Sequence, residues 1–189
     1  MPMRETILFI AMSLDGYLAD QRGGVGWLDG LEGGQRGYQD LLEQVDTVVM
    51  GWNTYHQIVT QLSPNDWPYA GLESYVVTHR NCPDRGQVRF TGDPCALVEG
   101  LKQGSGKDIW ICGGANLAGQ LLQAGLVDRL WISVVPVLLG RGTPLFGPEG
   151  VRTPLRLLQT REDHGLVELV YGCGPGTGGS SGTNRSGTV

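Results

Sequence analysis

Apolar and polar positions along this chain predict strands alternating with helices. A continuous apolar run over residues 6–14 is typical of a buried strand. Shorter apolar runs predict further strands over 47–50, 74–78, 88–90 and 108–112. Residues 130–139 are almost entirely apolar, which is the pattern of a strand buried on both faces.

Amphipathic segments between these runs predict helices. One helix is expected over 37–44, and another after Asn53, where Tyr55, Ile58, Val59 and Leu62 follow a helical spacing. Asp93 and Pro94 predict the start of a helix that ends near residue 103. A further helix follows Gly113 and Gly114, with Asn116 as its candidate cap, and ends at Gly125.

Two apolar runs, 155–161 and 167–171, lie on either side of the turn Asp163-His164-Gly165, which predicts a closing antiparallel hairpin. The fold class is therefore α/β: a mostly parallel central sheet flanked by helices, with a C-terminal antiparallel hairpin. Residues 3–171 form a single domain, and the glycine-rich stretch 17–34 is expected to be a long loop. Residues 172–189, rich in Gly, Ser and Thr, are expected to be a flexible tail.

Composition narrows the function classes. The 189 residues carry a formal net charge of −5 without any run of Lys or Arg, which argues against nucleic acid or an anionic membrane as a partner. The N-terminus lacks the features of a signal peptide, and no apolar segment approaches the roughly 18 residues of a membrane span, so we expect a cytoplasmic protein. The four cysteines and three histidines are scattered, which predicts no metal site and disfavours a metal- or thiol-dependent hydrolase.

The stretch 109–122 carries the strongest functional signal. An apolar strand leads directly into Gly113-Gly114, and a helix follows. Glycines remove the side chains that would block a ligand, and the first N–H groups of the helix suit a phosphate or pyrophosphate. An ordinary tight turn between a strand and a helix explains the same residues without any ligand.

Two other strand ends carry suggestive residues. Gly51 to Thr54 follow one strand, and Thr78-His79-Arg80 follow the next. Ligands of open α/β sheets bind at the carboxyl ends of strands, so these residues can hold a dinucleotide, with its pyrophosphate over the helix ends and a 2′-phosphate near Arg80. The Rossmann fingerprint G-x-G-x-x-G does not follow the first strand, however.

Four motifs in order give a family resemblance: Met-Ser-Leu-Asp-Gly-Tyr-Leu-Ala at 12–19, Val-Met-Gly-Trp-Asn-Thr-Tyr at 49–55, Ile-Cys-Gly-Gly-Ala at 111–115 and Val-Pro-Val-Leu-Leu-Gly-Arg-Gly at 135–142. Together they resemble the dihydrofolate-reductase-like superfamily, and within it the reductase domain at the C-terminus of the riboflavin-biosynthesis protein RibD. The likeness is greatest to stand-alone, single-domain bacterial members and spans roughly residues 5–171.

This resemblance implies a homodimeric, NADPH-dependent reductase of a small planar heterocycle, such as a pterin or a ribityl-pyrimidine precursor of riboflavin. Its cofactor contacts would come from residues at the carboxyl ends of several strands: Ala11, Gly51, Asn53, Thr54, Thr78, His79, Arg80, Gly113, Gly114, Ala115, Asn116 and Leu117. Dihydrofolate reductases hold a cis peptide between paired glycines, so the bond between Gly113 and Gly114 is expected to be cis.

The chain also departs from its relatives. Trp52 stands where many of them have Arg or Lys, Tyr17 replaces a usual basic residue, and the deaminase half of RibD has no counterpart. A degenerate homologue that binds a nucleotide or another small molecule without catalysis is therefore the alternative to an active reductase.

Hydride transfer leaves a negative heteroatom that must be protonated, directly or through water. Dihydrofolate reductases use a carboxylate on the helix after the long loop; counting along this chain places that position at Glu32 or near Gln35. Asp15, at the end of the first strand, is the other candidate acid, so Asp15 and Glu32 are the predicted catalytic residues. Trp27 and Tyr17 are the predicted substrate contacts.

Overall fold

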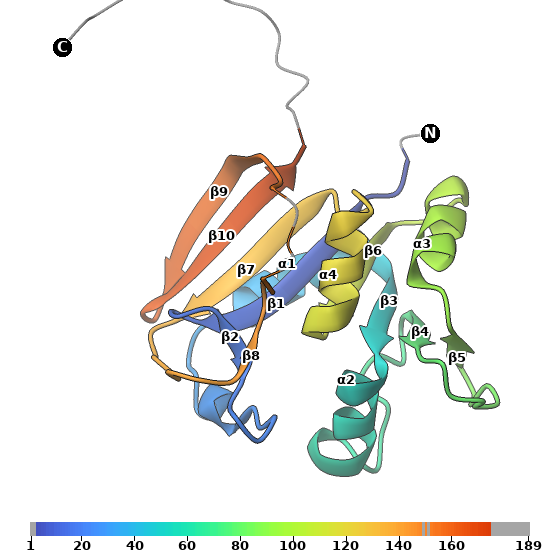
Figure 1. The fold of residues 1–189 in the computed structure, drawn as a ribbon, viewed down its shortest axis with the longest axis horizontal. Coiled ribbons are helices and arrows are strands. Elements are labelled where there is room, and N and C mark those ends of the chain that lie inside the picture. Colours follow the sequence, from blue (N-terminus) through green and yellow to red (C-terminus); the bar gives the residue numbers. More distant parts are fainter. Residues whose placement is uncertain (1–2, 149, 151, 175–189) are drawn as a thin grey trace, which may run out of the picture.

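A computed structural model describes residues 3–148, 150 and 152–174 of the chain. Its centre is an eight-stranded sheet with the order β5-β4-β3-β6-β1-β7-β10-β9 (Figure 1). The strands are β1 (Thr6–Ser13), β3 (Val45–Gly51), β4 (Glu73–Val77), β5 (Val88–Thr91), β6 (Asp108–Gly113), β7 (Arg129–Val135), β9 (Leu155–Asp163) and β10 (Leu166–Cys173). Strands β5 to β7 in this order run parallel, whereas β10 is antiparallel to both β7 and β9. The predicted fold class is confirmed.

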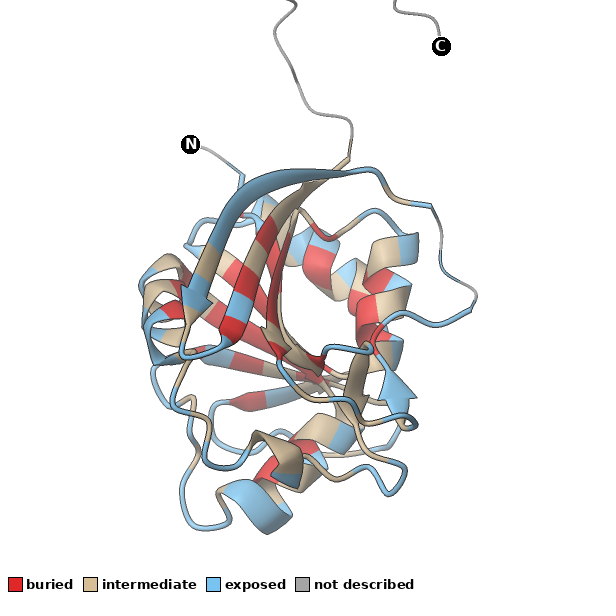
Figure 2. Cartoon of the chain, turned by 90° about the vertical axis from the view of Figure 1, so that its left-hand side faces the viewer, coloured by how far each residue is buried: buried red, intermediate tan, exposed pale blue. Residues whose placement is uncertain are grey.

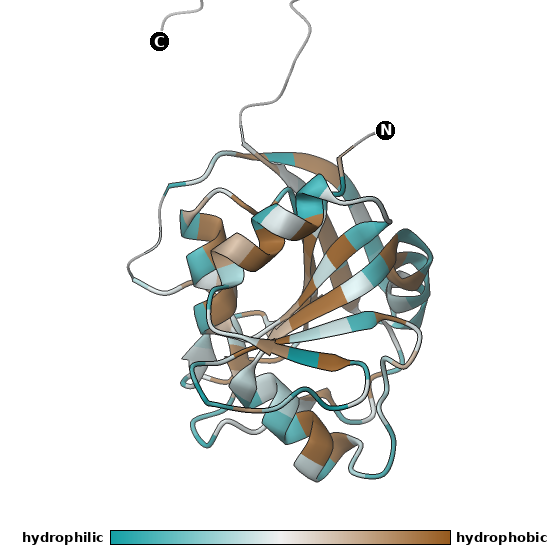
Figure 3. Ribbon diagram, turned by 90° about the vertical axis from the view of Figure 1, so that its right-hand side faces the viewer, coloured by the Kyte–Doolittle hydropathy of each residue, from teal (hydrophilic) through white to brown (hydrophobic). Residues whose placement is uncertain are grey.

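Helices cover the two faces of the sheet. On one face lie α1 (Gln35–Gln44) and α2 (Trp52–Gln57), which continues as the π-helix η2 (Ile58–Leu62). On the other face lie α3 (Pro94–Gln103) and α4 (Ala115–Gln123). Strand β1 serves both layers, because Ile7 and Phe9 pack on the first side and Leu8 and Ile10 on the second. Figure 3 shows how the hydrophobic residues concentrate on the central strands.

The structure moves several predicted boundaries. Helix α1 begins at Gln35, two residues earlier than expected, and β7 ends at Val135, four residues before the predicted end of its apolar run. The predicted loop 17–34 contains a short strand, β2 (Tyr17–Ala19), which pairs with β8 (Thr143–Pro144), and a 3-10 turn, η1 (Gly26–Leu28). Strand β10 runs to Cys173, into the predicted tail, whose residues 175–189 lie outside the described part of the chain.

Of the three predicted helix caps, one is correct. The Asp93 carboxylate accepts a hydrogen bond from Ala96 N at 2.9 Å and caps α3. The predictions for Asn53 and Asn116 were wrong: α2 and α4 begin after Gly51 and Gly114, and neither helix has a side-chain cap. Both helices begin two residues earlier than these caps would require, at Trp52 and Ala115, so both asparagines fall inside the first helical turn.

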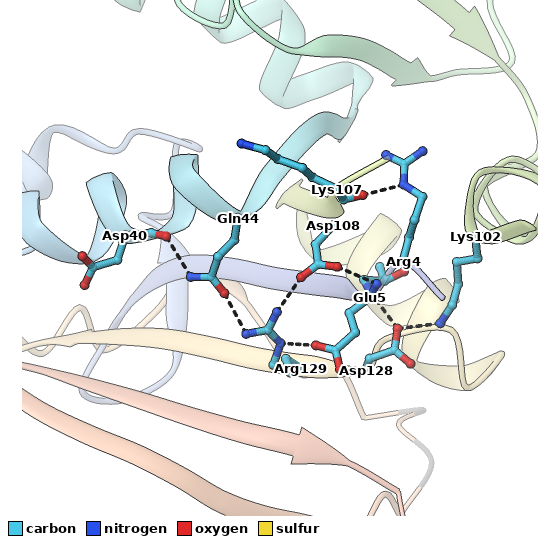
Figure 4. Close-up of polar contacts among 10 residues, drawn as sticks. Arg4, Glu5, Asp40, Gln44, Lys102, Lys107, Asp108, Asp128 and Arg129 are labelled. Atoms are coloured by element: carbon cyan, nitrogen blue, oxygen red, sulfur yellow. Dashed lines mark hydrogen bonds and ion pairs between the residues drawn. The ribbon is translucent and has the colours of Figure 1, made fainter. Parts of the chain in front are cut away.

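At the amino-terminal edge of the sheet, charged groups tie neighbouring strands together (Figure 4). Arg129 at the start of β7 pairs with Asp108 at 2.7 Å and with Glu5 at 2.5 Å, and donates to Gln44 Oε1 at 3.0 Å. These partners belong to β6, the segment before β1, and α1. The guanidinium therefore joins three elements at one point.

The same edge holds two further ion pairs. Arg4 pairs with Asp46 in β3, and its Nε donates to the carbonyl of Lys107. Lys102 in α3 pairs with Asp128 at 2.5 Å, and this carboxylate also accepts from Thr6 N at 2.7 Å. Together with Arg129, these groups fix where β1, β3, β6 and β7 begin.

Candidate active site

The carboxyl ends of the parallel strands meet at the opposite edge of the sheet. In the β3–β6 pairing Met50 lies beside Gly113, so the glycines that end the two strands are neighbours. A Cβ atom added to Gly51 would lie 3.6 Å from Gly114 N. The two strand-to-helix turns predicted from the sequence are therefore brought together.

The Gly113-Gly114 turn has the geometry of a close-approach site. Gly113 has φ +125°, a conformation that side chains with a Cβ rarely adopt, and its peptide bond to Gly114 is cis, as the resemblance implied. The first N–H to bond within α4 is that of Ala118, which donates to Gly114 O at 3.0 Å. The N–H groups of residues 115–117 are thus left for a ligand at the positive end of the helix.

In α2 and α4, not every predicted cofactor residue has a side chain that is placed to contact a ligand. Thr54 Oγ1 lies 3.7 Å from the position that a Cβ on Gly114 would take, so it faces the turn. The Asn116 side chain instead accepts a hydrogen bond from Gln120 at 2.6 Å, and that of Leu117 is buried in the core, so these two can contribute only their backbone. Asn53 is exposed on α2.

Arg80 reaches this edge from the end of β4. Its guanidinium lies over the Trp52 ring, with 4.8 Å between Cζ and the ring centroid, and Trp52 also stacks on His56. Thr78 Oγ1 accepts from Arg80 N at 3.1 Å and shapes the turn. Trp52 therefore packs against the cation that follows the neighbouring strand β4.

A cavity of about 240 Å³ lies between β1, β7, the end of the long loop and α1. Ala11 lines it, and β1, which contains Ala11, pairs with β6, the strand that ends at Gly113. The described residues around the cavity are Phe9, Ala11, Leu28, Leu31, Gly33, Gly34, Gln35, Tyr38, Ser133 and Leu166.

Asp15, predicted as a catalytic acid, lies outside this lining. Its carboxylate accepts from Ser13 Oγ at 2.6 Å, from Leu139 N at 3.1 Å and from Gly140 N at 2.7 Å. The Ser13 hydroxyl, followed by these backbone N–H groups, lowers the pKa of Asp15 from its ordinary value. An ionised carboxylate that holds the loop after β7 in place is poorly suited to donate a proton.

The other predicted contacts also fall outside the cavity lining. Glu32 is exposed, and Tyr17 lies in β2, opposite Pro144. Trp27 precedes the lining residue Leu28, and its buried Nε1 finds no hydrogen-bond partner among the described residues. That buried donor is the feature of Trp27 that fits a ligand contact.

Three polar side chains line the cavity that the sequence did not single out for this role: Gln35, Tyr38 and Ser133. Tyr38 and Ser133 carried no motif, because Tyr38 fits an amphipathic helix and Ser133 interrupts an apolar strand only once. The sequence pointed to Gln35 only as one of two positions that could correspond to the carboxylate of dihydrofolate reductases. Burial raises the pKa of Tyr38, so this hydroxyl stays protonated at neutral pH.

Other site types find no support within the described residues. No three His, Cys, Asp or Glu side chains gather there as metal ligands, and all four cysteines are free. No helix in the same part of the chain has both the length and the apolar character needed to cross a bilayer.

Known sequences show what this chain is similar to. Residues 4–167 match the family described as the RibD C-terminal domain. The protein YwjB of Bacillus subtilis is 40% identical over 173 residues, which cover 89% of this chain and 97% of YwjB.

Solved structures show the same fold. A structure described as a riboflavin biosynthesis protein from Shewanella sp. PV-4 aligns with a TM-score of 0.76 and 29% identity, over 90% of this chain and 99% of the other. Dihydrofolate reductase of Schistosoma mansoni aligns with a TM-score of 0.60 and 15% identity, over 90% of this chain and 98% of that enzyme. This second likeness concerns the fold alone.

Proposed function

Since the chain belongs to the RibD C-terminal domain family, we propose that it is a reductase that transfers a hydride from NADPH to a small planar heterocycle. The observation that carries the proposal is the glycine turn at Gly113-Gly114, where the first N–H groups of α4 lack a capping side chain near the end of β3, while β1, the neighbour of β6, lines a cavity. A nucleotide pyrophosphate and the ring of a substrate would then occupy adjoining parts of one site.

The residues at this edge fit NADPH. The N–H groups of residues 115–117 and the Thr54 hydroxyl would bind the pyrophosphate, where a Cβ at Gly113 would intrude. Thr78, His79 and Arg80 would surround the adenosine ribose, with Arg80 binding the 2′-phosphate from its place on Trp52. The Ala11 backbone, beside the cavity, would contact the nicotinamide amide.

The cofactor would supply the hydride, and the chain would orient the acceptor and deliver a proton. The cavity wall offers the hydroxyls of Tyr38 and Ser133 and the amide of Gln35, which can hold a water molecule beside the reacting heteroatom. No carboxylate belongs to the described lining, so we propose that the proton arrives through such a water.

The test is a fluorescence titration of NADPH and NADH, followed by a screen of pterins and riboflavin precursors for oxidation of the bound cofactor. We expect saturable NADPH binding and turnover of at least one heterocycle. Arg80→Ala should weaken NADPH by about 10- to 100-fold, the value of one or two charge-assisted hydrogen bonds, and leave NADH unchanged. Arg89→Ala is the control, because Arg89 also lies over an aromatic ring, that of Tyr75, but on β5.

Failure of both nucleotides to bind would refute the reductase. Equal losses of NADPH and NADH in Arg80→Ala would refute the role of Arg80. Binding without turnover across the panel would favour the second candidate, a homologue that binds a nucleotide without catalysis, for which the absence of a carboxylate from the described cavity lining is the supporting observation.

We also propose that the protein is a homodimer that pairs through β9. This strand is one of the two edge strands of the sheet, and Figure 2 shows its exposed surface. Leu155, Leu157 and Leu158 are 45%, 54% and 44% exposed, and an edge strand with such residues favours pairing with another chain. Light scattering should give a dimer for the wild type and a monomer for Leu157→Lys. A wild-type monomer would contradict the proposal.

A further inference from the structure

A second cavity lies on the α1 side of the sheet, near the residues where β3 and β6 begin. Its volume is about 350 Å³, compared with about 240 Å³ for the first cavity. Helix α1 contributes Tyr38 and Leu42 to its wall, the loop before β4 contributes Tyr69 and Leu72, and Lys107 precedes β6. This volume is at the lower end of the range for small-molecule sites, so the cavity suits a ligand of one or two rings.

Two tyrosine rings in this wall favour an aromatic ligand. Tyr38 and Tyr69 both lie edge-on to Trp110, with their ring centroids 5.9 Å and 5.1 Å from that of Trp110. The Tyr69 hydroxyl already has a partner, because it lies 3.7 Å from Cys112 Sγ in β6. Aromatic rings gain energy from edge-to-face and offset contacts with other rings, beyond the area that they bury. A planar ring would therefore extend the existing aromatic cluster.

The one acidic residue of the described lining, Asp46, is engaged within the chain. Its carboxylate forms an ion pair with Arg4. It also accepts hydrogen bonds from Thr47 Oγ1 and from Lys107 N, each at 2.8 Å. Because the Arg4 guanidinium balances its charge and three groups donate to it, Asp46 is poorly suited to bind a cationic ligand.

The ammonium group of Lys107 differs from the other cations at this edge of the sheet. It forms no ion pair with a described residue, and Figure 4 shows its side chain extending away from the carboxylates of Asp108 and Asp128. Its Nζ donates to the carbonyl of Glu43, in the last turn of α1, at 3.0 Å, which leaves two of its three N–H groups. Lys107 is exposed, so these groups lie at the mouth of the cavity.

We propose that this cavity binds a small aromatic carboxylate, with its ring against Tyr38 and Tyr69 and its carboxylate on Lys107 Nζ. A charge-assisted hydrogen bond is roughly twice as strong as a neutral one, so the carboxylate provides the selectivity. Tyr38 also lines the first cavity, so the ligand would contact a residue that both cavities share. The proposal does not use the nucleotide site and is independent of the proposed function.

The experiment compares three probes that share a benzene ring and differ in charge: benzoate, benzamide and benzylamine, which is an ammonium ion at neutral pH. Each is titrated into the full chain by isothermal calorimetry. The wild type should bind benzoate about 10-fold more tightly than benzamide, the value of one hydrogen bond to a charged group, and benzylamine most weakly. Equal affinities for the three probes, a preference for benzylamine, or no binding of benzoate would overturn the proposal.

Variants then locate the site. Lys107→Met should lower the affinity for benzoate to that for benzamide, which should not change, and Lys107→Arg should keep the preference. Arg36→Met is the matched control, because Arg36 is an exposed cation on α1 that does not line the cavity. Ser133→Ala changes the first cavity only and should also leave benzoate binding intact.

Thermal melts establish that the variants fold, and the comparison of probes on the wild type does not depend on them. A loss of benzoate binding in Arg36→Met or Ser133→Ala as large as that in Lys107→Met would overturn the proposal, and so would an unchanged preference in Lys107→Met. Selective benzoate binding by a protein that binds neither NADPH nor NADH would uphold this site and refute the reductase.

Discussion

The polar groups at the two edges of the central sheet differ in whether they have partners within the chain. At the amino-terminal edge, Arg129, Arg4 and Lys102 each have a carboxylate partner within the chain. Figure 4 shows the carboxylates that pair with Arg129 and Lys102. At the carboxyl-terminal edge, the first N–H groups of α4 have no capping side chain, and the polar side chains of the cavity wall have no partner among the described residues.

This difference indicates that one edge contributes to the stability of the fold and the other to ligand binding. Buried or half-buried polar groups that satisfy one another add to the folded state and leave nothing for a ligand, whereas unsatisfied groups indicate where a ligand or water belongs. Substitutions at the first edge should therefore change the free energy of unfolding, and substitutions at the second should change affinity. Four predictions test this division, beginning with the largest expected effect.

Gly113→Ala should raise the Kd for NADPH by about 100-fold. The φ of +125° disfavours any Cβ, and the added methyl would lie 3.1 Å from Ile10 Cδ1, so the turn must depart from the geometry that we propose binds the pyrophosphate. Gly119→Ala in α4 is the control, since an added Cβ there meets nothing within 4 Å. Thermal melts establish that both variants fold. A folded Gly113→Ala with unchanged affinity would place the nucleotide elsewhere.

Arg129→Met should lower the free energy of unfolding by about 1–3 kcal/mol, because Asp108 and Glu5 lose their partner at a partly buried junction. Its Kd for NADPH should stay within about twofold of wild type, well below a tenfold change of 1.4 kcal/mol. Urea denaturation and the NADPH titration measure the two quantities. In Arg156→Met, an exposed position, both should be near wild type. A large loss of affinity in Arg129→Met would show that the edges are not independent.

Trp52→Leu should raise the Kd for NADPH by about two- to fivefold and leave that for NADH unchanged. The ring holds Arg80 by a cation–π contact, and such contacts contribute about 0.5–1 kcal/mol when exposed. Tyr75→Leu is the parallel change under Arg89 and should have no effect on either nucleotide. Equal weakening of both nucleotides would indicate that Trp52 touches the cofactor directly.

The smallest expected effect concerns pH. His164 Nδ1 lies 2.8 Å from Asp163, which raises the pKa of His164, and Asp163 Oδ2 accepts from Gly34 N before α1. Because the folded pKa exceeds 6.5, this contribution is present below that pH and is lost as pH rises through the raised value. Wild-type stability should fall slightly over that range. His164→Asn, which tolerates the φ of +53°, should remove the change; an identical pH profile in this variant would refute the assignment.

Local sequence signals predicted the fold and the glycine turn. The strands could be predicted because their apolar runs are strong. The glycine turn could be predicted because Gly113 and Gly114 by themselves leave that turn without side chains. The caps at Asn53 and Asn116 were predicted wrongly. The preference for certain residue types at helix caps does not determine at which residue a strand ends and the helix begins.

The cavity could not be predicted from local signals. Its polar wall depends on the pairing of Ala11 with Ser133 across β1 and β7, and on α1 reaching over both strands from a separate part of the chain. The contact of Trp52 with Arg80 likewise requires β3 and β4 to be neighbours. Both features depend on which residues pair between strands that are far apart in the sequence. A single sequence does not show this pairing.

Hydrogen–deuterium exchange of the full chain, with and without NADPH, tests the division between the two edges most directly. We expect slower exchange for amides 114–117, 52–54 and 78–80, together with unchanged exchange at 4–6, 108 and 128–129. Protection confined to the amino-terminal edge, or no protection at 114–117 when NADPH is bound, would contradict it.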